Sequence, residues 1–165
     1  MANTDRPFGF EPVLLIRSRP YAQDASDSTA IFINDVVAVE TDGYIAAAAA
    51  GSTLILGSAL NYSAASTANT VSVADHADQE FHAQDDGDGT TLTQAHVFSN
   101  CDHIAGAGST TTKLSGHEID ISDTKNTAAG FLLLDIVDNV DNAVGANAII
   151  RCECAEHLKK DQIAV

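Results

Sequence analysis

Val73–Thr90, VADHADQEFHAQDDGDGT, combines the two signals that decide the fold: alternation with a period of two, and Asp-Gly turns. Phe81 and Ala83 alternate with polar neighbours, which places the apolar side chains on one face of an extended strand. The two Asp-Gly pairs that follow are typical of tight turns. The stretch therefore predicts a β-strand with a charged outer face that ends in a turn.

Short strands separated by turn residues continue along the chain. Apolar or alternating segments recur at 31–40, 52–60, 70–75, 128–139 and 147–157. Asp42-Gly43 is a strong hairpin signal between two of these apolar regions. A break in the strand is expected at Asn34-Asp35.

Residues 91–99 are the best helix candidate. Thr91 and Gln94 have the spacing of a capping box. Leu92, Ala95 and Phe98 would share one face of such a helix. Many short strands with one short helix predict a mainly β fold, a β-barrel or β-sandwich of the β-tulip-like kind.

All three prolines fall within the first twenty residues. Proline fixes φ and favours an extended residue before it, so this segment is predicted to be extended. The predicted organisation is an extended N-terminal arm over 1–20, a single β-rich domain over 21–158 and a C-terminal tail over 159–165. An arm that packs on its own domain stays open as an alternative.

The chain has 8 basic and 23 acidic residues, a formal net charge of −15. The arm holds three bases and two acids, whereas residues 21–158 hold three bases and twenty acids, a net charge of −17. Nucleic acid and anionic membrane are disfavoured as partners because both require a basic surface. An acidic body with a weakly basic arm predicts two surfaces with different partners.

The three cysteines do not form a disulfide framework, since Cys152 and Cys154 lie two apart in one strand and Cys101 lies elsewhere. All three are predicted to be reduced. The first residues contain no apolar run of signal-peptide length, and the longest apolar run, IAAAAA, is too short to span a bilayer. The protein is expected to be made soluble, in a cytosol.

The acidic stretch 73–90 is a candidate metal site because it holds six carboxylates and two histidines. An EF-hand loop starting at Gln84 would place Asp86, Asp88 and Gly89 correctly, but its first ligand would be Gln and its twelfth Ala95. The six histidines lack zinc-binding spacing. No metal and no cofactor are predicted, although a calcium site of another kind stays open.

No catalytic signature is present in the sequence. The chain has no G-x-S-x-G elbow, and AGAGSTTTK departs from a phosphate-binding loop because Lys113 is followed by Leu114. No catalytic residues are predicted, and the protein is expected not to be an enzyme.

Four segments occur in a fixed order: DRPFGFEPV at 5–13, VADHADQEFHAQDDG at 73–87, GSTTTKLSGHEIDIS at 108–122 and VDNAVGANAIIRCECAEH at 140–157. With these segments the chain resembles a family of small virion proteins of tailed phages, especially marine ones, similar to head-decoration (cement) proteins. The resemblance covers both ends and most of residues 70–157. Residues 41–69 carry no motif.

The resemblance implies a β-rich protein, often a homotrimer, whose N-terminal arm binds the major capsid protein. It implies a place on the outer capsid surface of the virion, after synthesis in the cytoplasm of a bacterial host. Four arm residues are carried over from the family: Pro7, Phe8, Gly9 and Pro12. Charge and aromatic area extend the expected capsid-binding arm to Arg6, Phe10, Arg17 and Arg19. Positions assigned to folding are Asp75, Asp78, Phe81, Asp138, Asn139, Asp141, Asn142, Gly145 and Asn147.

The expected function is capsid decoration, in which several weak arm contacts, joined in one oligomer, hold shell subunits together without a reaction. Small apolar side chains at 44–51 and 52–60 are expected to supply the contacts of the trimer. Another virion component, in the tail, a head fibre or a glycan-binding adhesin, is the alternative. A small hydrolase is the third hypothesis.

Overall fold

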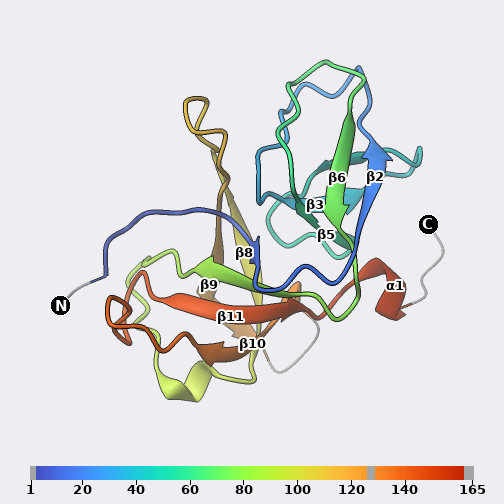
Figure 1. The fold of residues 1–165 in the computed structure, drawn as a ribbon. Coiled ribbons are helices and arrows are strands. Elements are labelled where there is room, and N and C mark those ends of the chain that lie inside the picture. Colours follow the sequence, from blue (N-terminus) through green and yellow to red (C-terminus); the bar gives the residue numbers. More distant parts are fainter. Residues whose placement is uncertain (1–2, 126–128, 162–165) are drawn as a thin grey trace.

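The computed structural model describes residues 3–125 and 129–161 and consists of two antiparallel β-sheets (Figure 1). The six-stranded sheet has the order β1-β7-β11-β10-β8-β9, and the five-stranded sheet has the order β2-β6-β5-β3-β4. The strands are β1 Glu11–Pro12, β2 Ser18–Ala22, β3 Val36–Val39, β4 Ile45–Ala47, β5 Ile55–Ala59, β6 Thr70–Ala74, β7 Glu80–Gln84, β8 Asn100–Gly106, β9 Gly116–Lys125, β10 Phe131–Ile136 and β11 Ile149–Cys154. The prediction of a mainly β fold with a short helix is confirmed.

The predicted helix over 91–99 is only one 3₁₀ turn, Gln94–His96. Its capping box joins Thr93 to His96, so the predicted pairing of Thr91 with Gln94 is wrong. Leu92 is buried while Phe98 is 76% exposed, so the two do not share a face. A single turn cannot form the amphipathic face that the spacing suggests, because such a face needs several turns. A four-residue α-helix, α1 Leu158–Asp161, follows the last strand.

The main core lies between the two sheets, because strand residues alternate between the two faces of each sheet. Its larger members are Phe10, Val36, Ile55, Phe81, Leu92, Ile119, Ile121, Phe131, Leu133 and Ile150. A second cluster on the other face of the five-stranded sheet contains Ile31, Val37, Ile45, Leu56, Val71 and Val73. All three cysteines are free, as predicted, and all three are buried.

Turn residues act where the sequence predicts them. Asp42-Gly43 lies in the hairpin between β3 and β4, where the φ of Gly43 is +87° and the Gly43 N–H donates to the Glu40 carbonyl over 3.1 Å. Asn34, at the predicted break, has a φ of +69°. The strand expected to end near Gly57 continues to Ala59, because Ser58 and Ala59 pair with Ala74 and Val73 of β6. The two strands pass so closely that a Cβ on Gly57 would lie 1.9 Å from the Ala74 carbonyl oxygen.

The N-terminal segment is extended, but it belongs to both sheets. Strand β1 pairs with β7 and β2 pairs with β6, each at the edge of its sheet. A domain boundary after residue 20 would divide β2. The structure therefore has the alternative arrangement, in which the arm packs on its own domain.

Two further expectations change in the structure. All five residues of β5 are buried within the monomer, so this part of 52–60 is not exposed on the surface of the single chain. Helix α1 crosses the predicted start of the C-terminal tail at residue 159, and residues 162–165 lie outside the described residues.

Candidate interaction surface

Two residues of the expected capsid-binding arm are part of the core. Phe10 is 1% exposed and stacks on Phe131, with ring centroids 4.3 Å apart. Gly9 has a φ of +76°, and a Cβ there would lie 2.3 Å from the Asn34 carbonyl oxygen. The folded chain buries the Phe10 ring, so in this structure the ring is not exposed to a partner, and the contact with capsid stays a prediction.

Other arm residues lie partly or fully at the surface. Arg6 and Arg19 are exposed, and Pro7, Phe8 and Pro12 are half-buried. The Arg6 N–H donates to the Gln84 side chain over 2.8 Å, and the Phe8 carbonyl accepts from Asn34 over 3.0 Å. These bonds fix the backbone and leave the Arg6 and Arg19 side chains exposed.

Arg17 belongs to an ion cluster centred on the buried carboxylate of Asp75. The Asp75 side chain is fully buried and accepts from Arg17 Nε over 2.8 Å, from the Tyr21 hydroxyl over 2.6 Å and from Lys159 Nζ. Burial acts to raise the pKa of Asp75, but the hydrogen bonds from Lys159, Tyr21 and Arg17 outweigh it and hold that pKa well below its usual range. Burial and the bond to Asp75 raise the pKa of Tyr21 to about 12. Arg17 therefore serves the fold, as does Asp75.

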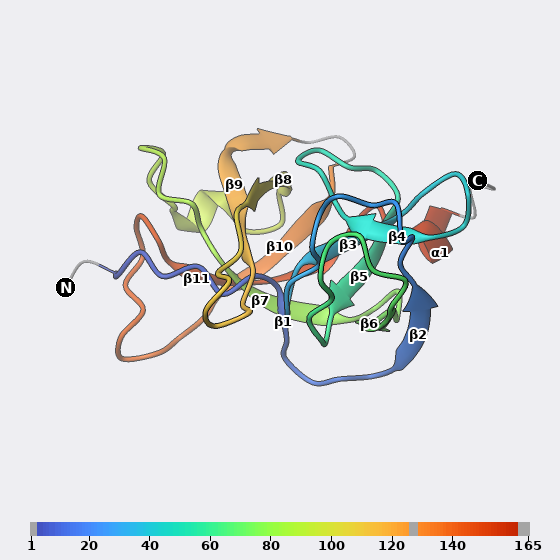
Figure 2. The same ribbon diagram turned by 90° about the horizontal axis from the view of Figure 1, so that it is seen from above.

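The connection between β1 and β2 carries four consecutive exposed aliphatic residues, here named the apolar ridge: Val13, Leu14, Leu15 and Ile16. Their side chains are 42%, 78%, 47% and 51% exposed, respectively. Figure 2 shows this blue connection between β1 and β2 along one edge of the ribbon. A run of this kind in water is typical of a surface that another molecule covers.

Hydrogen bonds hold the backbone of the apolar ridge in place. Gln79, which is 1% exposed, donates from Nε2 to the Leu14 carbonyl over 2.8 Å and accepts the Ile16 N–H at Oε1 over 2.9 Å. The Val13 N–H donates to the Glu80 carbonyl over 3.1 Å. The ridge therefore presents its side chains from an ordered backbone.

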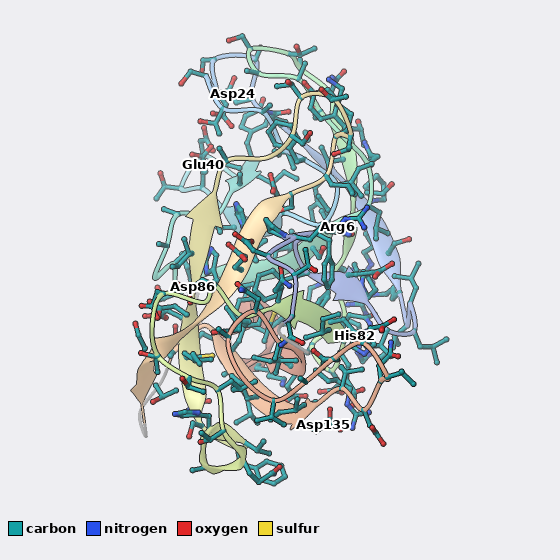
Figure 3. All side chains as sticks on the ribbon, turned by 90° about the vertical axis from the view of Figure 1, so that its left-hand side faces the viewer. Arg6, Asp24, Glu40, His82, Asp86 and Asp135 are labelled. Carbon is teal, nitrogen blue, oxygen red and sulfur yellow. The ribbon has the colours of Figure 1, made fainter. Side chains whose placement is uncertain are left out.

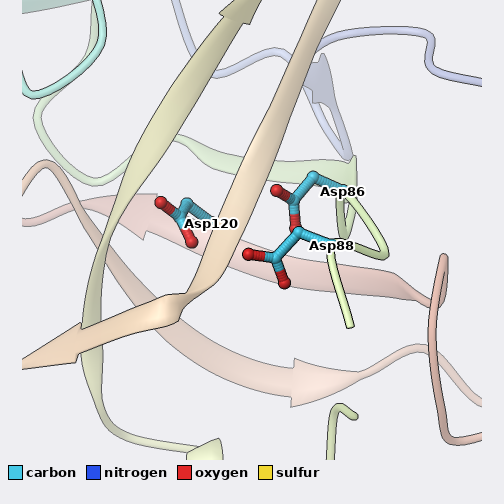
Figure 4. Close-up of side chains that lie close together, drawn as sticks. All are labelled: Asp86, Asp88 and Asp120. Atoms are coloured by element: carbon cyan, nitrogen blue, oxygen red, sulfur yellow. The ribbon is translucent and has the colours of Figure 1, made fainter. Parts of the chain in front are cut away.

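A second group of polar side chains lies at the end of β7. Oxygen atoms of Asp86, Asp88 and Asp120 all lie within 4.8 Å of one another (Figure 4). The Asp86 N–H donates to the Ile119 carbonyl over 3.1 Å, which brings the loop after β7 beside β9. Three carboxylates at this separation could hold a divalent cation such as calcium, and they come from two separate segments, unlike an EF-hand loop.

Repulsion and burial act together around this cluster. Burial raises the pKa of Glu118 to about 7, and the charges of Asp5, Asp86 and Asp85 add to the shift. Burial also raises the pKa of Asp85 to about 7, with a contribution from the charge of Asp86. This part of the surface is therefore an unfavourable concentration of negative charge above neutral pH.

Comparison with known protein families, with curated proteins and with solved structures gives no match for this chain. Among the helices of the described residues, none is both long enough and apolar enough to cross a membrane.

Sequence reasoning placed the arm at the surface but did not find the apolar ridge. The signal was the unbroken run VLLI between two prolines, since a half-buried strand would alternate. The interpretation of Val73–Thr90 as a strand and a turn agrees with β7 and with the positive φ of Gly87 and Gly89. It missed Asp120, for which no local signal exists.

Proposed function

We propose that the protein is a non-catalytic decoration (cement) protein of a tailed-phage head that binds the outer surface of the capsid lattice through its apolar ridge. The observation that carries the proposal is the exposure of four consecutive large aliphatic side chains on a backbone held by hydrogen bonds. The resemblance of four sequence segments to phage virion proteins indicates the partner.

The ridge is suited to weak, repeated binding. Complete burial of one such side chain contributes about 1.5–3 kcal/mol, and these four are already partly covered, so one ridge contributes a few kcal/mol. Because Gln79 holds the backbone, little conformational entropy is lost on binding. Exposed Arg19 adds a positive charge nearby, which favours an acidic partner surface.

Several ridges acting together would make the attachment strong. The proposal includes a homotrimer, which matches the three-fold positions of an icosahedral lattice. Joining three weak sites raises their effective concentration. Binding to the assembled shell alone stabilises that shell by mass action, and no chemical reaction is needed.

The test is co-sedimentation with expanded heads assembled from the major capsid protein of the same phage. The double variant Leu14→Ser/Leu15→Ser is expected to bind at least about tenfold more weakly, because two exposed leucines lose their contact. Val140→Ser/Val144→Ser is the matched control, since these valines are 98% and 62% exposed in the loop between β10 and β11.

Equal binding by the ridge variant and the wild type would contradict the proposal, and so would an equal loss in the control. The copy number in purified particles separates decoration from the alternative. A decoration protein is present in numbers comparable to the capsid protein, whereas a tail or fibre component is present in few copies.

A further inference from the structure

A cavity of about 480 Å³ is lined by residues of the β8–β9 hairpin, of β4 and the loop after it, and of the loop before β3. Eight of its twelve lining residues are Ala or Gly, and their small side chains leave the space empty. Ala49, Ala105 and Ala107 are exposed, so the cavity opens to solvent on their side. The volume and the apolar walls of this cavity are typical of a site that binds a small organic molecule.

Two buried polar side chains, Asp35 and His117, interrupt the apolar lining. They are 2% and 4% exposed. Asp35 Oδ2 accepts the Phe32 N–H over 2.7 Å, whereas Asp35 Oδ1 is buried and makes no hydrogen bond of good geometry. Burial raises the pKa of Asp35 to about 6, and the Ser115 side chain and the Phe32 N–H act against that rise. An unpaired buried carboxylate oxygen is costly, so a donor supplied by a ligand would be favourable here.

The hydrogen bonds of His117 determine what it offers. Its Nδ1 accepts the Val36 N–H over 3.2 Å, so the neutral ring carries its proton on Nε2. Nε2 lies 3.6 Å from Asp35 Oδ1, too far for a direct hydrogen bond. Burial, with the nearby ring of His103, lowers the pKa of His117 to about 3, so the ring is neutral at pH 7. The pair therefore presents one donor and one acceptor.

We propose that this cavity binds a small neutral alcohol, with an apolar body against the alanines and Phe32 and a hydroxyl group between Asp35 and His117. A hydroxyl oxygen can accept from Nε2–H and donate to Oδ1 at once. An ammonium group only donates and would face the Nε2–H donor, and a carboxylate would be repelled by Asp35. This site is separate from the apolar ridge and does not rest on the proposed function.

The experiment follows backbone amides by NMR while four probes of one shape are added: benzyl alcohol, protonated benzylamine, benzoate and toluene. The amides of Val36 and Ala48 report on the site, since Val36 bonds to His117 and Ala48 lines the cavity. Benzyl alcohol is expected to bind with a dissociation constant of about 1–10 mM and roughly fivefold more tightly than each other probe, as one additional hydrogen bond allows.

Substitutions in and beside the cavity test where benzyl alcohol binds. Ala47→Leu fills the cavity and is expected to weaken benzyl alcohol binding at least about tenfold. Ala46→Leu, the neighbouring position on β4 and not part of the lining, is the matched control and should bind as the wild type does. Asp35→Asn should lose the preference for benzyl alcohol over toluene.

Four results would overturn the proposal: no shift of these amides at ~50 mM benzyl alcohol, well above the affinity expected of so small a ligand; equal binding of the four probes; equal effects of Ala46→Leu and Ala47→Leu; or an unchanged preference in folded Asp35→Asn. The probe series on the wild type decides the matter if the Asp35 variant does not fold.

Discussion

At the scale of single residues, Phe10 ties the N-terminal segment to the main core. Its ring lies against Phe131 and meets Phe81 edge-on at a centroid distance of 6.5 Å. The Phe10 carbonyl also accepts the Ser58 hydroxyl over 2.7 Å, so the residue joins both sheets. The structure therefore places Phe10 among the residues that determine stability.

We expect Phe10→Ala to lower the free energy of unfolding by about 3–5 kcal/mol, because the substitution leaves a cavity between the sheets. Phe8→Ala is the control, since Phe8 is half-buried and should lose less than half of that amount. Urea denaturation followed by circular dichroism measures both. Similar losses in the two variants would mean that the Phe10 ring does not hold the arm in the core.

Asp75 is expected to stabilise the fold through its ion cluster. Asp75→Asn should cost roughly 3 kcal/mol at pH 7, because Arg17, Tyr21 and Lys159 lose the charged acceptor that they share. The pKa of Asp75 is lowered in the folded protein, so its contribution is present above about pH 4 and is lost as the pH falls through the lowered pKa. The difference between variant and wild type, measured by denaturation, should be constant from pH 7 to 5 and shrink below about 4. A difference that grows with acid would contradict this assignment.

Ionisation of Glu118 has the opposite effect on the stability of the fold. Its pKa is raised to about 7 in the folded protein, so ionisation above that pH destabilises the fold. Glu118→Gln should increase the free energy of unfolding at pH 8 by about 1–2 kcal/mol, allowing for solvent around a half-buried group. The gain should shrink as the pH falls from 7 towards 4.5, and melting curves across this range measure it. A gain that is the same at pH 5 and pH 8 would show that the charge is not the cause.

At the scale of secondary structure elements, the local patterns predicted the strands that have one polar and one apolar face. Alternation identified β6, β7 and β11, and Asp42-Gly43 identified the hairpin of β3 and β4. Pairing of β1 with β7 and of β2 with β6 joins residues between 48 and 71 positions apart, and no local pattern encodes such contacts. The spacing of a capping box predicts a longer helix than the 3₁₀ turn at Gln94–His96, because this segment has no sustained apolar face.

The candidate interaction surface shows the same contrast between what local patterns predict and what depends on contacts between distant residues. The prolines and arginines of the arm predict that it is extended and basic. Which of its side chains face solvent depends on contacts with residues elsewhere in the chain. Gln79 turns Leu14 and Ile16 outward through its hydrogen bonds, and Phe131 receives Phe10. Asp35 and His117 come together across the sheets, which their separation in sequence conceals.

The loop after β7 and strand β9 together hold the three carboxylates that could bind a metal ion. The sequence predicts that folding requires no ion, so melting in excess EDTA should match melting in calcium within about two degrees. Asp120→Asn, which removes one member of the carboxylate cluster, serves as the control. A rise of ~5 °C in calcium that is absent in this variant would show that Asp86, Asp88 and Asp120 bind the ion.

At the scale of the whole molecule, acidic side chains are spread along its length. Asp24 and Glu40 lie towards one end, Asp86 lies near the middle, and Asp135 lies near the other end (Figure 3). With a net charge of −15, copies of the chain repel one another. Any oligomer must therefore be held by apolar contacts between exposed side chains. The residues of β5 are buried within the monomer and are not among these side chains.

We expect a homotrimer whose assembly is favoured by salt, because screening within roughly 8 Å at physiological ionic strength weakens the repulsion between carboxylates. Multi-angle light scattering across a salt series measures the mass. An oligomer held by opposite charges would dissociate as salt is added. A monomer at every ionic strength would equally contradict the expected trimer.

The most direct measurement of the central claim is a cryo-electron microscopy map of expanded heads saturated with this protein. The account predicts density for the chain on the outer surface of the lattice, with Val13, Leu14, Leu15 and Ile16 buried against the major capsid protein. Density in which the apolar ridge faces solvent, or a chain found only at the tail, would contradict it.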